Sequence, residues 1–145
     1  MNKLSSFIGA TLLLSSLPLA AIADPNGVNQ HQLSLPLVEL NNPCTAGHDS
    51  IDGSLDLHGV TQHSEGVTFL RVNAHGSAVD AKGIDYQVNG QSRFQFHDLL
   101  PATVYLRLKL TSQGSGDNAR LALALHVNEQ GHITRAEYSG VECLG

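Results

Sequence analysis

Residues 103–110 read TVYLRLKL and residues 120–127 read RLALALHV, and these two stretches carry the strongest indication of the fold class. Each stretch places a branched apolar residue at every second position. These residues are Val104, Leu106, Leu108 and Leu110 in the first stretch and Leu121, Leu123, Leu125 and Val127 in the second. A period of two is typical of a β-strand with one buried face. We therefore predict two strands, joined by the turn QGSGDN at residues 113–118.

The same alternation continues outward from this pair of strands. Residues 51–58 place Ile51, Leu55 and Leu57 on one face, and residues 66–75 are expected to form the next strand. Residues 132–143 follow the turn NEQG at residues 128–131 and form the last expected strand. The pattern predicts seven or eight short strands with no convincing helix, which favours an all-β fold, either an antiparallel sandwich or a closed barrel.

A further hairpin is predicted around Asn89-Gly90, because this dipeptide is a strong turn signal between two apolar runs. A three-residue loop at residues 89–91 would pair Tyr86 with Phe94 and Ile84 with Phe96. We prefer this register to the two-residue loop, since cross-strand partners share a face and these four side chains are apolar.

The N-terminus has the features of an export signal. Lys3 is followed by an apolar stretch over residues 7–19, and Ala21-Ile22-Ala23 is a small-x-small cleavage site. We expect a signal peptide at residues 1–23, and the alternative is an N-terminal membrane anchor. Residues 24–40 are then a polar lead-in and a possible edge strand from residue 33, with Pro36 indicating the edge. Residues 41–145 form a single β domain in the periplasm or the medium.

The composition narrows the classes of partner. Charged residues make up 14% of the chain and aromatic residues 5%, and there is no Trp. After removal of residues 1–23 the chain keeps seven Lys and Arg against thirteen Asp and Glu, a formal charge of −6. An acidic chain gives no overall electrostatic reason to bind nucleic acid or an anionic membrane. No later apolar run is long enough for a membrane helix.

The two cysteines, Cys44 and Cys143, stand near the two ends of the expected domain. Because export implies an oxidising compartment, we predict that they form a structural disulfide. Two free thiols or two metal ligands are the alternatives. No CxxC motif of a redox enzyme is present.

Several short motifs together resemble a group of small secreted bacterial proteins. They are Asn42-Pro43-Cys44-Thr45, Gly83-Ile84-Asp85-Tyr86, the QGSGDN turn, His126-Val127, Gly131 and Cys143. That group has an N-P-C-T-G-E-like opening, a G-x-G-x-N turn, a strand ending in His-Val and a closing Cys. Residues 46–48 depart from its pattern, since Ala-Gly-His replaces Gly-Glu. The group has no established activity, so the resemblance implies a β fold and a disulfide but no function.

Histidine is unusually abundant, with eight residues in the chain. A metal site needs imidazoles or carboxylates that converge on one ion, and HxD or HxE spacing places two such groups on one strand face. Asp56 and His58 have this spacing, as do His63 and Glu65. A Zn or Cu site at these four residues is one hypothesis, and scattered surface histidines are the other.

The strand at residues 120–127 has a second, small face made of Ala122, Ala124 and His126. Because its side chains are small rather than polar, this face is expected to contact either a ligand or another segment of the chain, and both interpretations stay open. It could line a barrel that holds a small apolar ligand, or it could pack against a neighbouring segment.

No catalytic motif emerges, since the chain has neither a GxSxG elbow nor an S-x-x-K pair. The sequence therefore favours an exported, non-enzymatic β domain that binds a small ligand or a protein. The alternative is a protein that binds a divalent metal through its histidines or depends on one.

Overall fold

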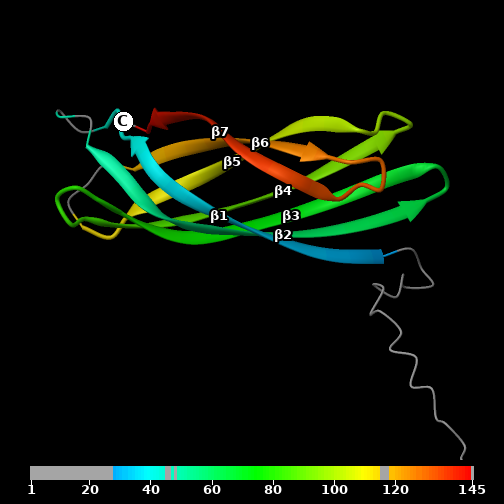
Figure 1. Ribbon diagram of the computed structural model, residues 1–145, viewed down its shortest axis with the longest axis horizontal. Coiled ribbons are helices and arrows are strands. Elements are labelled where there is room, and N and C mark those ends of the chain that lie inside the picture. The colour runs from blue at the N-terminus through cyan, green and yellow to red at the C-terminus, as the bar shows by residue number, and fades with distance from the viewer. Residues whose placement is uncertain (1–27, 45–46, 48, 115–117, 145) are drawn as a thin grey trace, which may run out of the picture.

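The computed structural model describes residues 28–44, 47, 49–114 and 118–144, and the expected signal peptide lies outside them. These residues form seven antiparallel strands and the turns between them (Figure 1). They are β1 (Val28–Asn41), β2 (Ser50–Ser64), β3 (Val67–Asp80), β4 (Asp85–His97), β5 (Ala102–Ser112), β6 (Ala119–Val127) and β7 (Ile133–Cys143). Each strand pairs with the next along the chain, so the sheet order is the sequence order.

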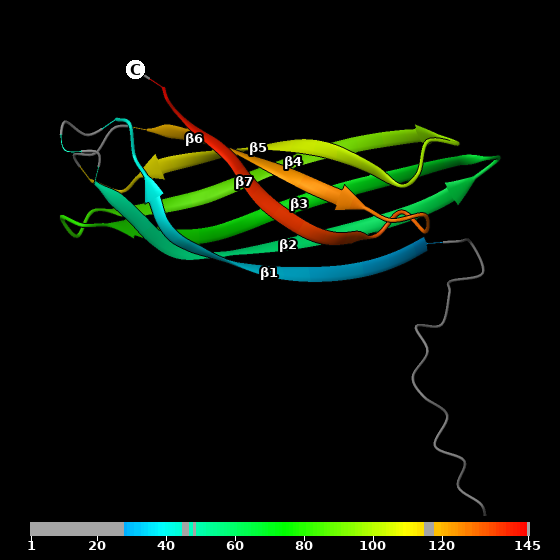
Figure 2. The same cartoon turned by 45° about the horizontal axis from the view of Figure 1, so that its top comes forward.

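The sheet curls into a nearly closed barrel, with β7 lying beside β1 (Figure 2). Two places interrupt the closure. Within the described residues no backbone ladder joins β1 to β7. The ladder between β4 and β5 is short, running only from Tyr86↔Ser112 to Asn89↔Lys109. The predicted all-β class and the strand number are confirmed, and the fold is closer to the barrel than to the sandwich.

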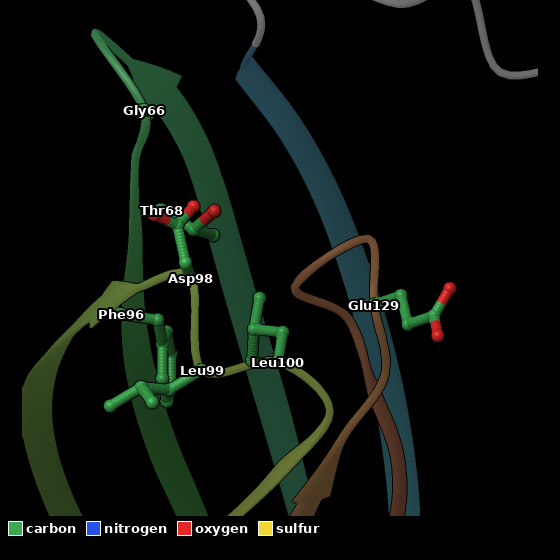
Figure 3. Close-up of a pocket in the computed structure, with 7 residues that line it drawn as sticks. All are labelled: Gly66, Thr68, Phe96, Asp98, Leu99, Leu100 and Glu129. Carbon is green, nitrogen blue, oxygen red and sulfur yellow. The ribbon is translucent and has the colours of Figure 1, made fainter.

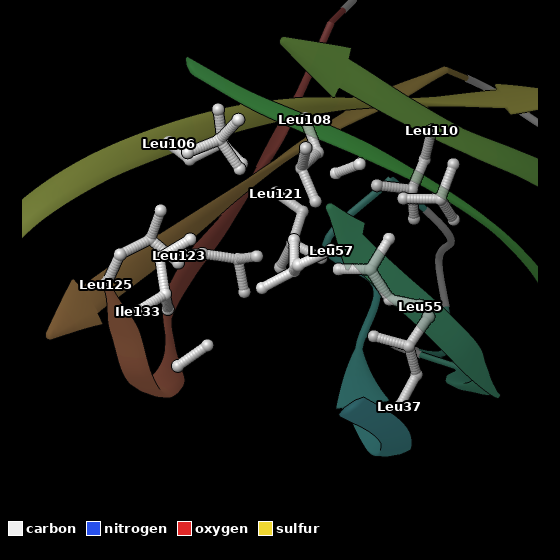
Figure 4. Packing of buried hydrophobic residues seen from close by; sticks show 14 of the residues in the cluster. Leu37, Leu55, Leu57, Leu106, Leu108, Leu110, Leu121, Leu123, Leu125 and Ile133 are labelled. Carbon is white, nitrogen blue, oxygen red and sulfur yellow. The ribbon is translucent and has the colours of Figure 1, made fainter. Parts of the chain in front are cut away.

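The inward face of the barrel is filled by the residues that the alternation predicted (Figure 4). Leucines dominate the fully buried positions: Leu37, Leu55, Leu57, Leu70, Leu106, Leu108, Leu110, Leu121, Leu123 and Leu125. Burying each such side chain contributes about 1.5 to 3 kcal/mol of favourable transfer free energy. The core therefore explains why a chain with so few aromatic residues folds.

The predicted disulfide between Cys44 and Cys143 is present, with a sequence separation of 99 residues. Other motif residues gather at the same end of the barrel. The side-chain oxygen of Asn42 accepts a hydrogen bond from the backbone N–H of Cys44 (2.9 Å), and the Asn42 amide nitrogen donates to the Tyr86 hydroxyl (3.4 Å). The Asn118 side chain accepts from the N–H of Ser112 (3.0 Å). These residues fasten turns and strand ends to one another.

The predicted hairpin at Asn89-Gly90 is wrong. Both residues lie inside the continuous strand β4, and neither has the positive φ that a tight hairpin turn needs. A Cβ on Gly90 would stand 2.8 Å from the carbonyl oxygen of Arg107 and 2.7 Å from the Leu108 side chain. The glycine is therefore needed for close approach of β5. The two-residue turn occurs instead at Glu65-Gly66, where both φ angles are positive, at 50° and 79°.

The first strand begins earlier than predicted. β1 starts at Val28, so residues 28–32 of the expected polar lead-in belong to the sheet. Its inward and outward positions alternate opposite β2 from Val28↔Gln62 onward. Polar side chains such as Gln30 and Gln32 hid this strand from the hydrophobic pattern, because they occupy its exposed face.

Candidate functional site

Charge is segregated among the strands of the barrel. β3, β4 and β5 are consecutive neighbours in the sheet and carry four exposed cations: Arg71, Arg93, Arg107 and Lys109. The only acidic residues in these strands are Asp80 and Asp85, which flank the turn joining β3 to β4. Asp80 is buried, where it accepts hydrogen bonds from the backbone of Lys82 and Ile84. We call the outward side of β3, β4 and β5 the basic face.

Arg71 and Arg93 lie directly opposite each other on β3 and β4. Like charges at opposed positions of a sheet repel and destabilise it. Neither arginine has an ion-pair partner within the part of the chain that the structure describes. Three other cations do have one: Lys82 pairs with Asp49 (3.3 Å), Arg120 with Glu142 (3.8 Å) and Arg135 with Glu137. The arginine pair is thus a local concentration of positive charge in an acidic protein.

Two shallow grooves meet at this arginine pair. The first, of about 420 Å³, is lined on its other sides mainly by Val28, Val60, Gln62, Phe69 and Gln95. The second, of about 390 Å³, is lined by Asn73, Gln91 and Ser92 together with the two arginines. An anionic group lying between Arg71 and Arg93 would therefore contact a mixed apolar and glutamine-lined groove on one side and a fully polar groove on the other.

Arg107 and Lys109 extend the basic face onto β5. Lys109 stands opposite Asn89 in the β4–β5 ladder, so it shares the outward side with that residue. Arg107 lies two residues earlier on the same side of the strand. Between the two cation pairs the exposed residues are neutral amides, among them Asn89 and Gln91. The carboxylates nearest to this surface lie at its margins: Asp85 is exposed at the start of β4, and Glu142 of β7 lines a groove together with Arg107.

The β1–β7 seam forms a second polar region, in which side chains link the two strands. His31 Nε2 accepts a hydrogen bond from the backbone N–H of Ile133 (3.0 Å), and its ring stacks on His132 with centroids 4.9 Å apart. The Tyr138 hydroxyl donates a hydrogen bond to the carbonyl oxygen of Pro36 (2.7 Å). With the disulfide at one end, these contacts hold β7 against β1.

Burial lowers the pKa of His31 to about 4, and the nearby His132 and His58 act in the same direction. Burial also raises the pKa of Tyr138 to about 12. Both shifts favour the neutral form, which makes the observed hydrogen bonds near neutral pH. The geometry of the seam therefore suits a structural role.

A third hollow, of about 360 Å³, lies beside the loop between β4 and β5 (Figure 3). Its lining includes Phe96, Leu99 and Leu100 and two carboxylates, Asp98 and Glu129. Leu99 is 71% exposed. The Glu129 side chain points away from the other lining residues, so the two carboxylates do not converge as an acid–base pair would (Figure 3).

The four residues of the metal hypothesis are not brought together. Asp56 accepts a hydrogen bond from Ser34 on the outward side of β2 (2.6 Å), and His58 shares that side. His63 stands on the other side and contacts the Thr68 hydroxyl (3.0 Å), and Glu65 lies in the turn that follows. Among the residues with described positions, no three His, Cys, Asp or Glu side chains gather closely enough to hold a metal ion.

The small face of β6 also points outward. Ala122, Ala124 and His126 are partly exposed, whereas the leucines between them fill the barrel. His126 lies within 3.3 Å of both the Thr103 hydroxyl and Glu137, on the two neighbouring strands. These three residues therefore do not line the interior of the barrel, as the interpretation with an enclosed apolar ligand required.

Sequence reasoning missed the basic face because it balanced charge over the whole chain. The signal was available strand by strand. Residues 67–79 and 86–112 contain six Lys, Arg and His residues, all of them exposed, but only one carboxylate, Asp98, which lies in a loop. Comparison of the two faces of each expected strand would have located Arg71, Arg93, Arg107 and Lys109 on one side.

No family model, curated protein or solved structure matches this chain. Within the described residues, no helix has the length and apolar character required to span a membrane. The fold and the charge pattern define a disulfide-stapled, nearly closed β-barrel domain with one cationic outer face.

Proposed function

We propose that this protein is an exported, non-enzymatic binding domain whose basic face binds an anionic ligand. The observation that carries the proposal is the Arg71–Arg93 pair. Two opposed guanidinium groups that have no carboxylate partner among the described residues repel each other, and a bound anion would relieve that repulsion. Arginine is also suited to this task, because its planar fork donates paired hydrogen bonds to carboxylate, phosphate or sulfate.

Export is supported by the leader-like sequence of residues 1–23, and the disulfide is consistent with an oxidising compartment. Binding without catalysis is consistent with the described pockets, in which Asp98 and Glu129 line one hollow but do not converge. A metal-dependent function has no comparable support, since no described cluster of ligands accompanies it.

The test is titration of the protein without residues 1–23 with sodium sulfate and sodium malonate, followed by backbone amide NMR. We expect saturable shifts centred on Arg71 and Arg93, which weaken as ionic strength rises. The double variant Arg71→Gln, Arg93→Gln should lose them.

Arg135→Gln is the matched control, because it removes the same kind of charge from an arginine that already pairs with Glu137. Its titration should match that of the unmodified protein. Shifts that spread evenly over all cations, or that survive in the double variant, would contradict the proposal.

A further inference from the structure

The basic face carries the same local arrangement twice. Phe69-Leu70-Arg71 on β3 and Tyr105-Leu106-Arg107 on β5 each place an aromatic ring and an arginine on the outward side, with a buried leucine between them. Phe69 is 36% exposed and Tyr105 is 63% exposed. Both rings therefore offer an apolar surface next to a cation without an ion pair in the described chain.

One small anion cannot contact all four cations of the basic face. Lys109 lies opposite Asn89, and Arg93 lies four residues further along β4. At about 3.4 Å per residue, these positions are about 14 Å apart along the strand. Arg107 lies nearer to Arg93, because it stands two residues before Lys109 on β5. A ligand that reaches Lys109 as well as Arg71 and Arg93 must therefore be extended and must carry more than one anionic group.

The surface between the cation pairs is suited to hydroxyl groups. Asn73, Asn89 and Gln91 present amides, which both donate and accept hydrogen bonds. Nucleic acid would favour a continuous track of stacking aromatic residues, and here only two rings stand at separate places. A lipid surface would favour a broad apolar patch, which the neutral amides do not form. An acidic polysaccharide matches the amides, the aromatic rings and the separated cation pairs of this face. Its sugar rings carry hydroxyl groups and an apolar ring face, and its carboxylates are regularly spaced.

We propose that the anionic ligand is an acidic polysaccharide that lies across β3, β4 and β5, with its carboxylates at Arg71–Arg93 and at Arg107–Lys109. This inference rests on the proposed function and deepens it by naming the ligand class. The two aromatic rings pack against sugar rings beside each cation pair, and the amides bind hydroxyl groups between them.

The test compares galacturonate oligomers of one, three and about twelve residues by isothermal titration calorimetry. Simultaneous contact at both cation pairs should make the longest oligomer bind at least about tenfold more tightly than the trimer. The double variant Arg107→Gln, Lys109→Gln should lose this gain with length but keep the response to sulfate at Arg71 and Arg93. Arg71→Gln, Arg93→Gln should weaken binding of every oligomer, and Arg135→Gln should change none.

The outcomes separate this inference from the proposed function. Sulfate binding at Arg71 and Arg93 without a gain for long oligomers would keep the proposed function and overturn the polysaccharide. Tighter binding of a neutral dextran, of an oligo-dT of matched charge or of phosphatidylglycerol vesicles would also overturn it. Absence of binding for sulfate, malonate and every oligomer would overturn both. Near-ultraviolet circular dichroism of each variant verifies that the barrel has folded.

Discussion

The β1–β7 seam and the basic face use polar side chains in opposite ways. At the seam, no backbone ladder joins the described residues of β1 and β7, and His31 and Tyr138 instead make hydrogen bonds to backbone groups of the other strand. On the basic face the ladder between β3 and β4 is complete, yet Arg71 and Arg93 repel each other across it. The first arrangement stabilises the closed barrel, whereas the second opposes stability.

The contrast between the two regions indicates which polar groups serve the fold and which serve a function outside it. Polar groups that bond to the neighbouring strand, as His31 Nε2 and the Tyr138 hydroxyl do, are explained by the stability they contribute, although the buried His31 Nδ1 has no hydrogen-bond partner among the described residues. Charged groups that destabilise the fold call for a role outside it, and binding is the simplest such role. If the comparison is right, breaking the seam must lower stability, and neutralising the basic face must not.

The largest effect is expected from the disulfide, which ties the seam at one end. Replacing both Cys44 and Cys143 by Ala removes a crosslink over 99 residues. In the chain-entropy model this lowers the free energy of unfolding by about 4 to 5 kcal/mol. Urea denaturation of the variant and of the reduced protein should agree, and a loss below about 1 kcal/mol would show that the seam holds without it.

The second effect is acid destabilisation through His31. Its pKa is about 4 in the folded protein against 6.5 in the unfolded chain, so the unfolded state binds the proton more readily. The contribution to stability is complete above pH 6.5 and is lost as the pH falls toward 4. Protonation also removes the Nε2 lone pair that accepts the Ile133 N–H and adds a charge beside His132 and near His58.

His31→Gln isolates this effect, because glutamine keeps an acceptor for the Ile133 N–H but does not titrate. Urea midpoints measured from pH 7 to pH 4 should fall less steeply for this variant than for the unmodified protein. Tyr138→Phe is the control at the same seam, since it removes the hydrogen bond to Pro36 without changing the slope over this pH range. Identical slopes for the His31 variant and the unmodified protein would rule out His31 as the titrating group.

Much of this fold was predictable, because one property, hydrophobicity at every second position, determines which side chains fill the barrel. Alternation identified the buried faces of β5 and β6 residue by residue, including Leu106 and Leu123. The prediction failed at Gly90, where the same residue type is compatible with two different local structures. Gly90 serves either a tight turn or close approach of a neighbouring strand, and only the position of Arg107 and Leu108 decides between them.

The candidate site was less predictable, because it depends on which strands become neighbours. The pairing of Arg71 with Arg93 follows from the continuity of β4, which the expected hairpin would have broken. The link from His31 to Ile133 spans 102 residues and follows from curling of the whole sheet. Local patterns identify which face a side chain occupies, but they do not identify its partner across the barrel.

The smallest expected effect is on the basic face, where the two opposed arginines should lower stability. The double variant Arg71→Gln, Arg93→Gln removes the opposed charges and should raise the free energy of unfolding by about 0.2 to 1 kcal/mol. Because screening shortens the reach of charge from about 30 Å at 0.01 M salt to about 3 Å at 1 M, the gain should shrink at high salt. Urea denaturation at both salt concentrations measures it.

Arg135→Gln is again the matched control, since it breaks the ion pair with Glu137 and should leave stability unchanged or slightly lower. If the double variant is more stable than the unmodified protein and Arg135→Gln is not, the repulsion lies between the two opposed arginines of the basic face. If the double variant were instead less stable at both salt concentrations, the two arginines would be structural residues like His31 and Tyr138. The difference between the seam and the basic face would then disappear, and with it the main argument for an anionic ligand.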